Sequence, residues 1–530
     1  MTQSELVDRE SLWSVLDQNW DVIVIGGGIT GAGILRLAVQ SGLKTILFEA
    51  NDFAYGTSSR SSKLVHGGLR YLKNGQINVT HESVCERDRM LREAPDLVSP
   101  LRFIIPNHSG GRSAVSQYRL GVIIYDLLGR KWQHGSLTSD CMAELFPQID
   151  PHGLLGGLYY YDAETDDARL VLRLMREALA RGGVCMNYTP VIDLLKTGDG
   201  QVCGVRVQDR SIDGEGRTAE VCARAVINAT GPWTDELRAH VAAPSCLRKL
   251  RGSHLVFPSD RLHVPCAMTM IHPRDRRTMF IIPWQGVTVV GTTDLDHPPE
   301  HETRYAEPRI QPEEVDYILE ALQACLPGAC LQSGDILSTF AGLRPIVSAG
   351  GRDPSKESRA HVILVEDGLV TITGGKLTTY RVMAHSVLRA VQAKLPHMKL
   401  VSKRPLFDRL GEANIPAGML PSYGYRTRAR YGDRFLAAWD GYPKALQQPM
   451  PGLPYTWAEL DWVARYEAVV HLDDLWLRRL RVGLLAPHGG VDLFPGARNI
   501  VQPALRWDDA RWSREEMRYR ELWYSCYDLP

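Results

Sequence analysis

The sequence predicts a mixed α/β fold with a Rossmann-type dinucleotide-binding domain, a mostly antiparallel second domain and a largely helical C-terminal region. The first domain is predicted by a short apolar strand, 20–25, that passes directly into Gly26-Gly27-Gly28-Ile29-Thr30-Gly31, a G-x-G-x-x-G pattern. Apolar residues then recur at helical spacing, and a second strand, 44–48, ends at Glu49. The second domain is predicted by several strand-like runs between residues 250 and 345.

The glycine pattern and the acid have defined roles in such a unit. The glycines permit a tight turn, let the backbone approach a pyrophosphate and let the helix pack on the strand. The pyrophosphate lies at the helix N-terminus, where N–H groups and the dipole favour negative charge. Glu49 can accept hydrogen bonds from ribose hydroxyls. The alternative is an ordinary glycine-rich turn, but strand, helix, second strand and acid in register favour dinucleotide binding.

Further elements follow along the chain. Two strands run into segments of small residues, where a cofactor can lie close to the backbone. These segments are Ala229-Thr230-Gly231 and Gly374-Gly375, the second of which is followed by Lys376. Residues 405–421 are predicted to be a linker, and residues 422–530 to be helical at first and then irregular. The other expected elements are helices at 115–128, 169–180 and 377–394, and strands at 191–195, 202–207, 223–228, 253–257, 278–282, 287–290 and 369–373.

Composition excludes several classes of function. The 530 residues predict two or three domains, and 61 basic against 61 acidic residues create no net field that would attract nucleic acid. The ten cysteines are scattered without a CxxC pair, which predicts reduced thiols in a cytosolic protein and no metal site. No window approaches the ~18 continuous apolar residues of a membrane span. Residues 1–19 lack the features of a signal peptide and could form a short amphipathic helix around Trp13 and Leu16.

Candidate catalytic groups lie beside the glycine-rich turns. The chain has no GxSxG, HExxH or P-loop lysine, so nucleophilic and zinc hydrolase chemistry is not indicated. His254 could take a proton from a hydroxyl while hydride leaves the adjacent carbon, and arginines suit bidentate capture of a phosphate. Each residue also has a plainer interpretation, a core histidine or a solvated arginine, and placement near the turns is what favours a catalytic role.

These residues belong to stretches that resemble bacterial FAD-dependent glycerol-3-phosphate dehydrogenase of the aerobic respiratory type. The resemblance covers about residues 20–395 in order, and beyond about Leu485 none is expected. The matching stretches are 21–33, 57–72 (TSSRSSKLVHGGLRYL), 161–162, 166–170, 228–233, 252–254, 282–284, 291–294, 342–345 and 374–380.

The resemblance implies a fold of the glutathione-reductase/D-amino-acid-oxidase type with a helical C-terminal cap. It divides the chain into an N-terminal extension (1–19), an FAD-binding domain (20–105, 150–250 and 345–397), a substrate-binding domain (106–149 and 251–344), a linker (398–421) and a cap with tail (422–530). It implies that sn-glycerol 3-phosphate is oxidised to dihydroxyacetone phosphate, with hydride passing from C2 to flavin N5 and electrons then to a membrane quinone.

Site residues are assigned on matching positions and on the motifs above. His254 and Arg344 are the candidate catalytic residues, with His254 as a hypothetical base. The candidate substrate contacts are Arg70, Tyr71, Arg344, Arg359 and Lys376. The candidate FAD contacts are Gly26, Gly28, Ile29, Thr30, Gly31, Glu49, Thr57, Ser58, Ser62, Lys63, Leu64, His66, Val191, Ala229, Thr230, Gly231, Gly375, Lys376, Leu377 and Thr378.

Partners and alternatives complete the expectations. A homodimer is expected, attached peripherally to the cytoplasmic face of the inner membrane. A basic helical surface with Arg426, Arg428, Arg430 and residues 478–481 is one candidate for that contact, and a solvated helical face is the alternative. Competing functions are a soluble glycerophosphate oxidase that reduces oxygen, a flavin-containing binding protein without catalysis, and an NAD-dependent dehydrogenase. The last has no need for the small-residue segments at 229–231 and 374–375.

Overall fold

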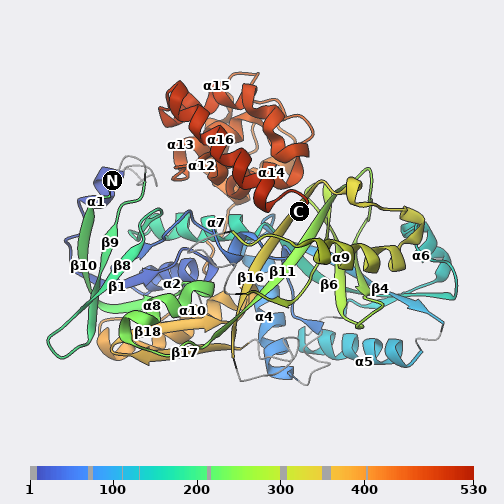
Figure 1. The fold of residues 1–530 in the computed structure, drawn as a ribbon, viewed down its shortest axis with the longest axis horizontal. Coiled ribbons are helices and arrows are strands. Elements are labelled where there is room, and N and C mark those ends of the chain that lie inside the picture. The colour runs from blue at the N-terminus through green and yellow to red at the C-terminus, as the bar shows by residue number, and fades with distance from the viewer. Residues whose placement is uncertain are drawn as a thin grey trace.

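A computed structural model describes residues 9–69, 76–109, 112–129, 132–211, 216–298, 307–348, 360–401 and 404–530 of the chain. Two large sheets lie side by side, and the C-terminal helices sit above the junction between them (Figure 1). No helix among these residues is long and apolar enough to cross a membrane.

The first sheet contains the dinucleotide-binding unit. Its main path runs β17-β18-β10-β1-β2-β7, with β1 parallel to both β2 and β10, and β8 and β9 continue antiparallel from β10. Buried on both faces, β1 is apolar throughout its inner residues, as a parallel strand requires. The strands are β1 (Trp20–Ile25), β2 (Thr45–Phe48), β7 (Val184–Met186), β8 (Val191–Lys196), β9 (Val202–Gln208), β10 (Thr218–Asn228), β17 (His361–Glu366) and β18 (Leu369–Gly374).

Three helices cover one face of this sheet and form a core with it. The helix α2 (Ile29–Gln40) contacts both α7 (Asp167–Leu179) and α10 (Tyr380–Ala390). The amphipathic pattern predicted for residues 169–180 marks a helix that is buried on nearly all sides, because α7 also lies under the C-terminal helices. The short α1 (Arg9–Trp13) precedes the sheet; it contains Trp13 as predicted, whereas Leu16 lies in the turn that follows.

The second sheet is antiparallel except where β4 pairs with β12, which confirms the predicted type of domain. Its path runs β15-β11-β14-β13-β12-β4-β6-β3, with β16 on β11 and β5 on β6. The strands are β3 (Leu64–Val65), β4 (Val98–His108), β5 (Gly135–Leu137), β6 (Leu154–Thr165), β11 (Leu247–Pro258), β12 (Ala267–Ile271), β13 (Thr278–Trp284), β14 (Val287–Gly291), β15 (Leu295–Asp296) and β16 (Ser338–Val347).

The structure places β4 and β6 in a different domain from the one that the sequence predicted for them. Most of β4 and all of β6 fall in 20–105 and 150–250, which the sequence assigned to the FAD-binding domain, yet both strands belong to the second sheet. The two strands pair with each other over their full length, and β4 joins β12 more than 150 residues later. Sequence reasoning missed this pairing because it is set by long-range contacts. The helices of this region are α4 (Ile77–Glu93), α5 (Arg112–Gly129), α6 (Ser139–Leu145) and α9 (Pro312–Cys325).

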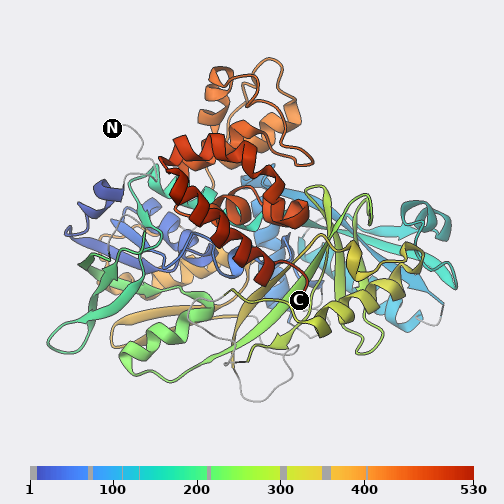
Figure 2. The same ribbon diagram turned by 45° about the horizontal axis from the view of Figure 1, so that its top comes forward.

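The C-terminal region is helical to its end, so the predicted irregular tail is wrong. Its aromatic residues form one core cluster, in which Trp476, Trp512 and Trp523 are buried. The cap packs on α7 of the first domain and on β11 and β16 of the second sheet, and Figure 2 shows it above both domains. Its helices are α11 (Pro421–Tyr431), α12 (Asp433–Ala438), α13 (Trp457–Tyr466), a π-helical turn (Asp474–Arg479), α14 (Val482–Leu485), α15 (Phe494–Leu505) and α16 (Asp509–Cys526).

The arginines proposed as a basic membrane surface are largely buried beneath this cap. The guanidinium groups of Arg478 and Arg479 both bind the carboxylate of Asp52, at 2.5 and 2.6 Å. Burial raises the pKa of Asp52, but the two arginines outweigh it and hold that pKa below its ordinary value. Arg481 binds the carboxylates of Asp166 and Asp167. The side chains of Arg428 and Arg430 are also buried. Arg478, Arg479 and Arg481 therefore attach the cap to the first domain. The buried Arg428 binds Asp433 within the cap, and Arg426, whose side chain is 22% exposed, binds Glu459 there.

Candidate functional site

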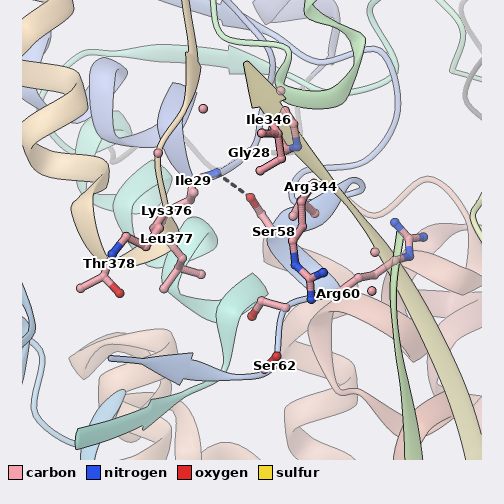
Figure 3. A pocket seen from close by; sticks show the side chains of 18 of the residues that line it. Gly28, Ile29, Ser58, Arg60, Ser62, Arg344, Ile346, Lys376, Leu377 and Thr378 are labelled. Atoms are coloured by element: carbon pink, nitrogen blue, oxygen red, sulfur yellow. Dashed lines mark hydrogen bonds between the residues drawn. The ribbon is translucent and has the colours of Figure 1, made fainter. Parts of the chain in front are cut away.

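A cavity of about 700 Å³ lies between the two sheets. Its volume falls within the range of about 300–1,000 Å³ that is typical of ligand sites. In Figure 3 the segment 376–378 lies on one side of the cavity and Arg344 on the other, with Ile29 and Ser58 between them. The predicted residues that line it are Gly26, Gly28, Ile29, Thr30, Glu49, Thr57, Ser58, Ser62, Leu64, His66, Val191, Ala229, Thr230, Gly231, His254, Arg344, Gly375, Lys376, Leu377 and Thr378.

The glycine turn leaves no room for side chains. Gly26 has φ +110°, and a Cβ there would lie 2.6 Å from the carbonyl oxygen of Ala229 at the end of β10. Gly31 does not line the cavity: a Cβ there would meet the carbonyl oxygen of Gly26 at 1.9 Å. Gly26 therefore allows two strands to end against each other, while Gly31 allows α2 to pack on the turn.

Glu49 ends β2 at the wall of the cavity. Its carboxylate accepts hydrogen bonds from the backbone N–H groups of Gly27 at 2.6 Å and Asn51 at 2.9 Å. Burial raises the pKa of Glu49 to about 7, although these two hydrogen bonds act in the opposite direction. The carboxylate thus ties the glycine turn to β2 and can accept a further donor from a ligand.

The loop after β2 connects the two domains around the cavity. The Ser58 hydroxyl accepts a hydrogen bond from the Ile29 N–H at 2.9 Å, at the start of α2. The Thr57 hydroxyl donates to the carbonyl of Leu343 on β16 at 2.5 Å. A single short loop therefore fixes the glycine turn of the first domain relative to the strand of the second domain that carries Arg344.

Lys63 behaves differently from the other residues of this loop, because it does not line the cavity. Its ammonium is buried and donates to the carbonyl of Ser59 at 2.6 Å and to the carboxylate of Asp167 at 3.0 Å. Burial lowers the pKa of Lys63 to about 8, and Asp167 only partly opposes this. The side chain supports the loop from behind, and the expected contact of Lys63 with FAD stays a prediction.

His254 lies on β11 at the wall of the cavity and is only 1% exposed. Its Nε2 is 2.8 Å from the hydroxyl of Ser62, and its ring stacks on Phe340 with centroids 4.5 Å apart. Burial, together with the positive charges of Arg344 and Lys63, lowers the pKa of His254 well below its ordinary value. The imidazole is therefore neutral at physiological pH, so one of its ring nitrogens carries no proton there.

Arg344 lies on β16, one strand away from His254. Its guanidinium donates to the Asp294 carboxylate at 2.8 Å, to the Thr293 carbonyl at 3.0 Å and to the Thr292 hydroxyl at 2.9 Å. Gly252 leaves the space that this guanidinium needs, since a Cβ there would lie 2.2 Å from it. The site thus holds a fixed cation suited to an anionic group of a ligand.

The segment after β18 closes the cavity on the opposite side. The Lys376 ammonium donates to the Ser83 hydroxyl at 2.7 Å, and the Thr378 hydroxyl donates to the carbonyl of His66 at 3.3 Å. Three predicted substrate residues, Arg70, Tyr71 and Arg359, lie outside the described part of the chain.

Sequence reasoning missed several lining residues. Arg277, Thr278 and Phe280 come from the start of β13, and Trp233 and His240 follow the end of β10. Trp233 stands two residues after the Ala-Thr-Gly segment, so that motif could have indicated it. Arg277 lies among other arginines in a loop and gave no such signal.

The site fits an FAD molecule. A glycine turn in which a Cβ would clash, a buried acid at the end of β2 and a cavity that runs between two domains are the features that a dinucleotide requires. Among the described residues, no group of three His, Cys, Asp or Glu side chains could hold a metal ion.

Comparisons with known proteins agree with this assignment. Residues 21–381 match the family model "FAD dependent oxidoreductase", and residues 418–512 match "C-terminal domain of alpha-glycerophosphate oxidase". "Glycerol-3-phosphate dehydrogenase 2" of Mycobacterium tuberculosis is 36% identical over 536 residues, covering 96% of this chain and 89% of the relative. "Aerobic glycerol-3-phosphate dehydrogenase" of Bacillus subtilis is 37% identical over 398 residues, covering 74% of this chain and 70% of the relative.

A solved structure extends the likeness to nearly the whole chain. The glycerol-3-phosphate dehydrogenase from Bacillus halodurans, complexed with FAD, has a TM-score of 0.77 and 28% identity, and the match covers 98% of each chain. The expectation that the family resemblance stops near Leu485 is therefore wrong, since both this structure and the second family model extend beyond that residue.

Proposed function

The chain belongs to the FAD-dependent glycerol-3-phosphate dehydrogenase family and uses FAD, and on this premise we propose that it oxidises sn-glycerol 3-phosphate to dihydroxyacetone phosphate. Bound FAD would supply the flavin ring that accepts hydride from C2 of the substrate. The observation that carries the proposal is a neutral, buried histidine in the same cavity as a fixed arginine, His254 and Arg344.

The chain's own residues divide the remaining work. Arg344 binds the substrate phosphate, because a guanidinium that Asp294 holds in place carries a fixed positive charge at the cavity wall. His254 takes the proton from the C2 hydroxyl, since an imidazole with a lowered pKa is unprotonated when the substrate binds. The Ser62 hydroxyl holds the imidazole in place through its Nε2.

The test uses the visible spectrum of the purified holoenzyme without oxygen. Glycerol 3-phosphate should bleach the flavin, and His254→Asn should slow this bleaching by about 100-fold or more while flavin content stays the same, as expected for removal of a general base. His385→Asn is the matched control, because His385 lies on α10 and does not line the cavity. An unbleached wild-type flavin would refute the substrate, and an equal rate in both variants would remove His254 as the base.

The electron acceptor is proposed to be a membrane quinone. On α5, Leu120 and Leu127 are 59% and 62% exposed and lie seven residues apart, on one face of the helix. Leu120 also lines the cavity, so the cavity wall continues into this apolar face. In Figure 1 this helix lies on the side of the molecule away from the cap. An exposed apolar helix face suits the surface of a lipid bilayer, from which a quinone could reach the cavity.

The alternative is an oxidase that reduces oxygen and acts in solution. Replacing Leu120 and Leu127 with Asp should weaken binding to anionic lipid vesicles and reduction of a long-chain quinone in them, while reduction of a water-soluble dye is retained. Peroxide release by the pure protein at the rate of substrate oxidation would instead favour the oxidase.

We also propose that the protein is a homodimer attached to the cytoplasmic face of the inner membrane. Sedimentation would test the dimer, and membrane fractionation would test the attachment.

A further inference from the structure

Residues 187–189, here called the pairing segment, follow β7 and bind the stretch of chain that carries Glu49. The N–H of Thr189 donates to the carbonyl of Glu49 at 2.7 Å, and the N–H of Tyr188 donates to the carbonyl of Asn51 at 2.8 Å. Glu49 and Asn51 both line the cavity. The backbone position of these two cavity residues therefore depends on the pairing segment.

Arg9, in α1, holds the pairing segment from outside the first sheet. Its Nη1 donates to the carbonyl of Asn187 at 3.0 Å, and its Nη2 donates to the carbonyl of Tyr188 at 3.1 Å and to the hydroxyl of Thr189 at 3.0 Å. Its Nε donates at 2.8 Å to the buried carboxylate of Asp209, directly after β9. The planar guanidinium thus contacts all three residues of the segment while the carboxylate fixes its position.

The backbone of the pairing segment needs such support. Tyr188 has φ +48°, a left-handed conformation that a residue with a side chain keeps only where its neighbours hold it. Its carbonyl is held by Arg9 and by the N–H of Arg210, at 3.1 and 2.8 Å. Its hydroxyl donates to Asp474 of the cap at 2.7 Å. The segment is therefore fixed by α1 on its backbone and by the cap through its side chain.

We propose that Arg9 is a positioning residue for FAD, and that it holds Glu49 in place for the adenosine half of the cofactor through the pairing segment. An acid at the end of the second strand of such a unit accepts hydrogen bonds from the ribose of adenosine, so its position affects binding of that half. Arg9 does not line the cavity and acts only through these backbone contacts. The inference concerns FAD binding and does not depend on which substrate is oxidised.

The test compares Arg9→Gln with Arg217→Gln in the FAD-loaded protein. Arg217 is the matched control, because within the described part of the chain its side-chain hydrogen bonds go to Asp209 and Glu10. Loss of the Arg9 contacts should make FAD dissociate about 10-fold faster, measured as the rise of flavin fluorescence. Arg217→Gln should release FAD at the wild-type rate. Equal rates in the two variants would overturn the proposal.

Binding of ADP to the FAD-free protein shows which half of the cofactor is affected. ADP carries the adenosine half without the flavin, so calorimetry should show that Arg9→Gln raises the Kd for ADP and the Kd for FAD by the same factor. Arg9→Lys keeps the charge and a donor beside Asp209, so it should recover part of the affinity for ADP. An unchanged Kd for ADP in Arg9→Gln, or no recovery in Arg9→Lys, would contradict the proposal.

Hydrogen exchange in the wild-type protein gives a readout that needs no variant. Because coupling between two positions is reciprocal, ADP should slow amide exchange in α1 as well as in the pairing segment. Exchange in α16, which does not contact either of them, should not change. Unchanged exchange in α1 would overturn the proposal, and this measurement decides it if Arg9→Gln does not fold.

Discussion

Replacing Glu49 with Gln should remove a pH-dependent loss of stability from the FAD-free protein. The folded protein holds the Glu49 proton up to a pKa of about 7, whereas the unfolded chain releases it near the ordinary value of 4.5. Between these values the folded state binds more protons, so the free energy of unfolding falls as the pH rises. At about 1.36 kcal/mol for each pKa unit, this side chain should reduce the free energy of unfolding by about 3 kcal/mol between pH 4.5 and pH 7.5.

The assay is urea unfolding of the apoprotein and of Glu49→Gln at pH 5 and pH 8. Groups common to both proteins cancel in the difference between them, including Glu164, whose pKa burial also raises to about 7. That difference should shift by up to about 3 kcal/mol in favour of the variant at pH 8. A difference that is the same at both pH values would show that Glu49 does not titrate as its burial implies.

FAD binding should reverse this effect. Ribose hydroxyls that donate to the Glu49 carboxylate favour its ionised form, so binding should lower the pKa of Glu49 and release a proton near pH 6. Calorimetry in two buffers of different ionisation enthalpy measures this proton, and Glu49→Gln should release none. Proton uptake by the wild-type protein would contradict the reasoning.

The remaining predictions concern contacts of the cap. Asp52→Asn leaves Arg478 and Arg479 buried without their shared carboxylate, so it should lower the free energy of unfolding by about 3–5 kcal/mol and expose the cap to proteolysis. Unchanged resistance to protease would show that these ion pairs do not hold the cap on the first domain. Tyr527→Phe removes the hydroxyl that accepts from Arg60 at 3.1 and 3.3 Å, so FAD should dissociate about 10-fold faster in a fluorescence assay. An identical rate would show that the C-terminus does not support the loop after β2, which carries Arg60.

The dinucleotide unit was predictable because its signals are local. The glycine turn, the helix behind it and Glu49 occupy one stretch of about thirty residues, and each is fixed by steric or hydrogen-bonding needs of that stretch. The second sheet was predictable in type but not in membership. The alternating strands indicated antiparallel pairing, but nothing in the sequence of β4 shows that its neighbour is β12.

The candidate site was predictable where a motif carried it. His254 and Arg344 lie in short segments next to small residues, and Gly252 and Gly291 prove to make the space for their side chains. Arg277 had no such context, since a loop with several arginines is typical of a solvated surface. At the cavity wall it pairs with Asp294, a residue seventeen positions later that the hairpin of β13 and β14 brings to it.

The arginines of the cap show why charge in a sequence does not predict a surface. Residues 478–481 carry three arginines, and each binds a carboxylate more than 300 residues earlier, Asp52 or the pair Asp166–Asp167, although Arg478 also pairs with Asp473 and Asp474 nearby. An arginine is buried when such a partner and further hydrogen bonds compensate its desolvation, which no local pattern reveals. Because Asp52 lies three residues after Glu49, the bond that holds the cap also orders the chain beside the FAD site. We therefore expect loss of Asp52 to weaken both the attachment of the cap and the binding of FAD.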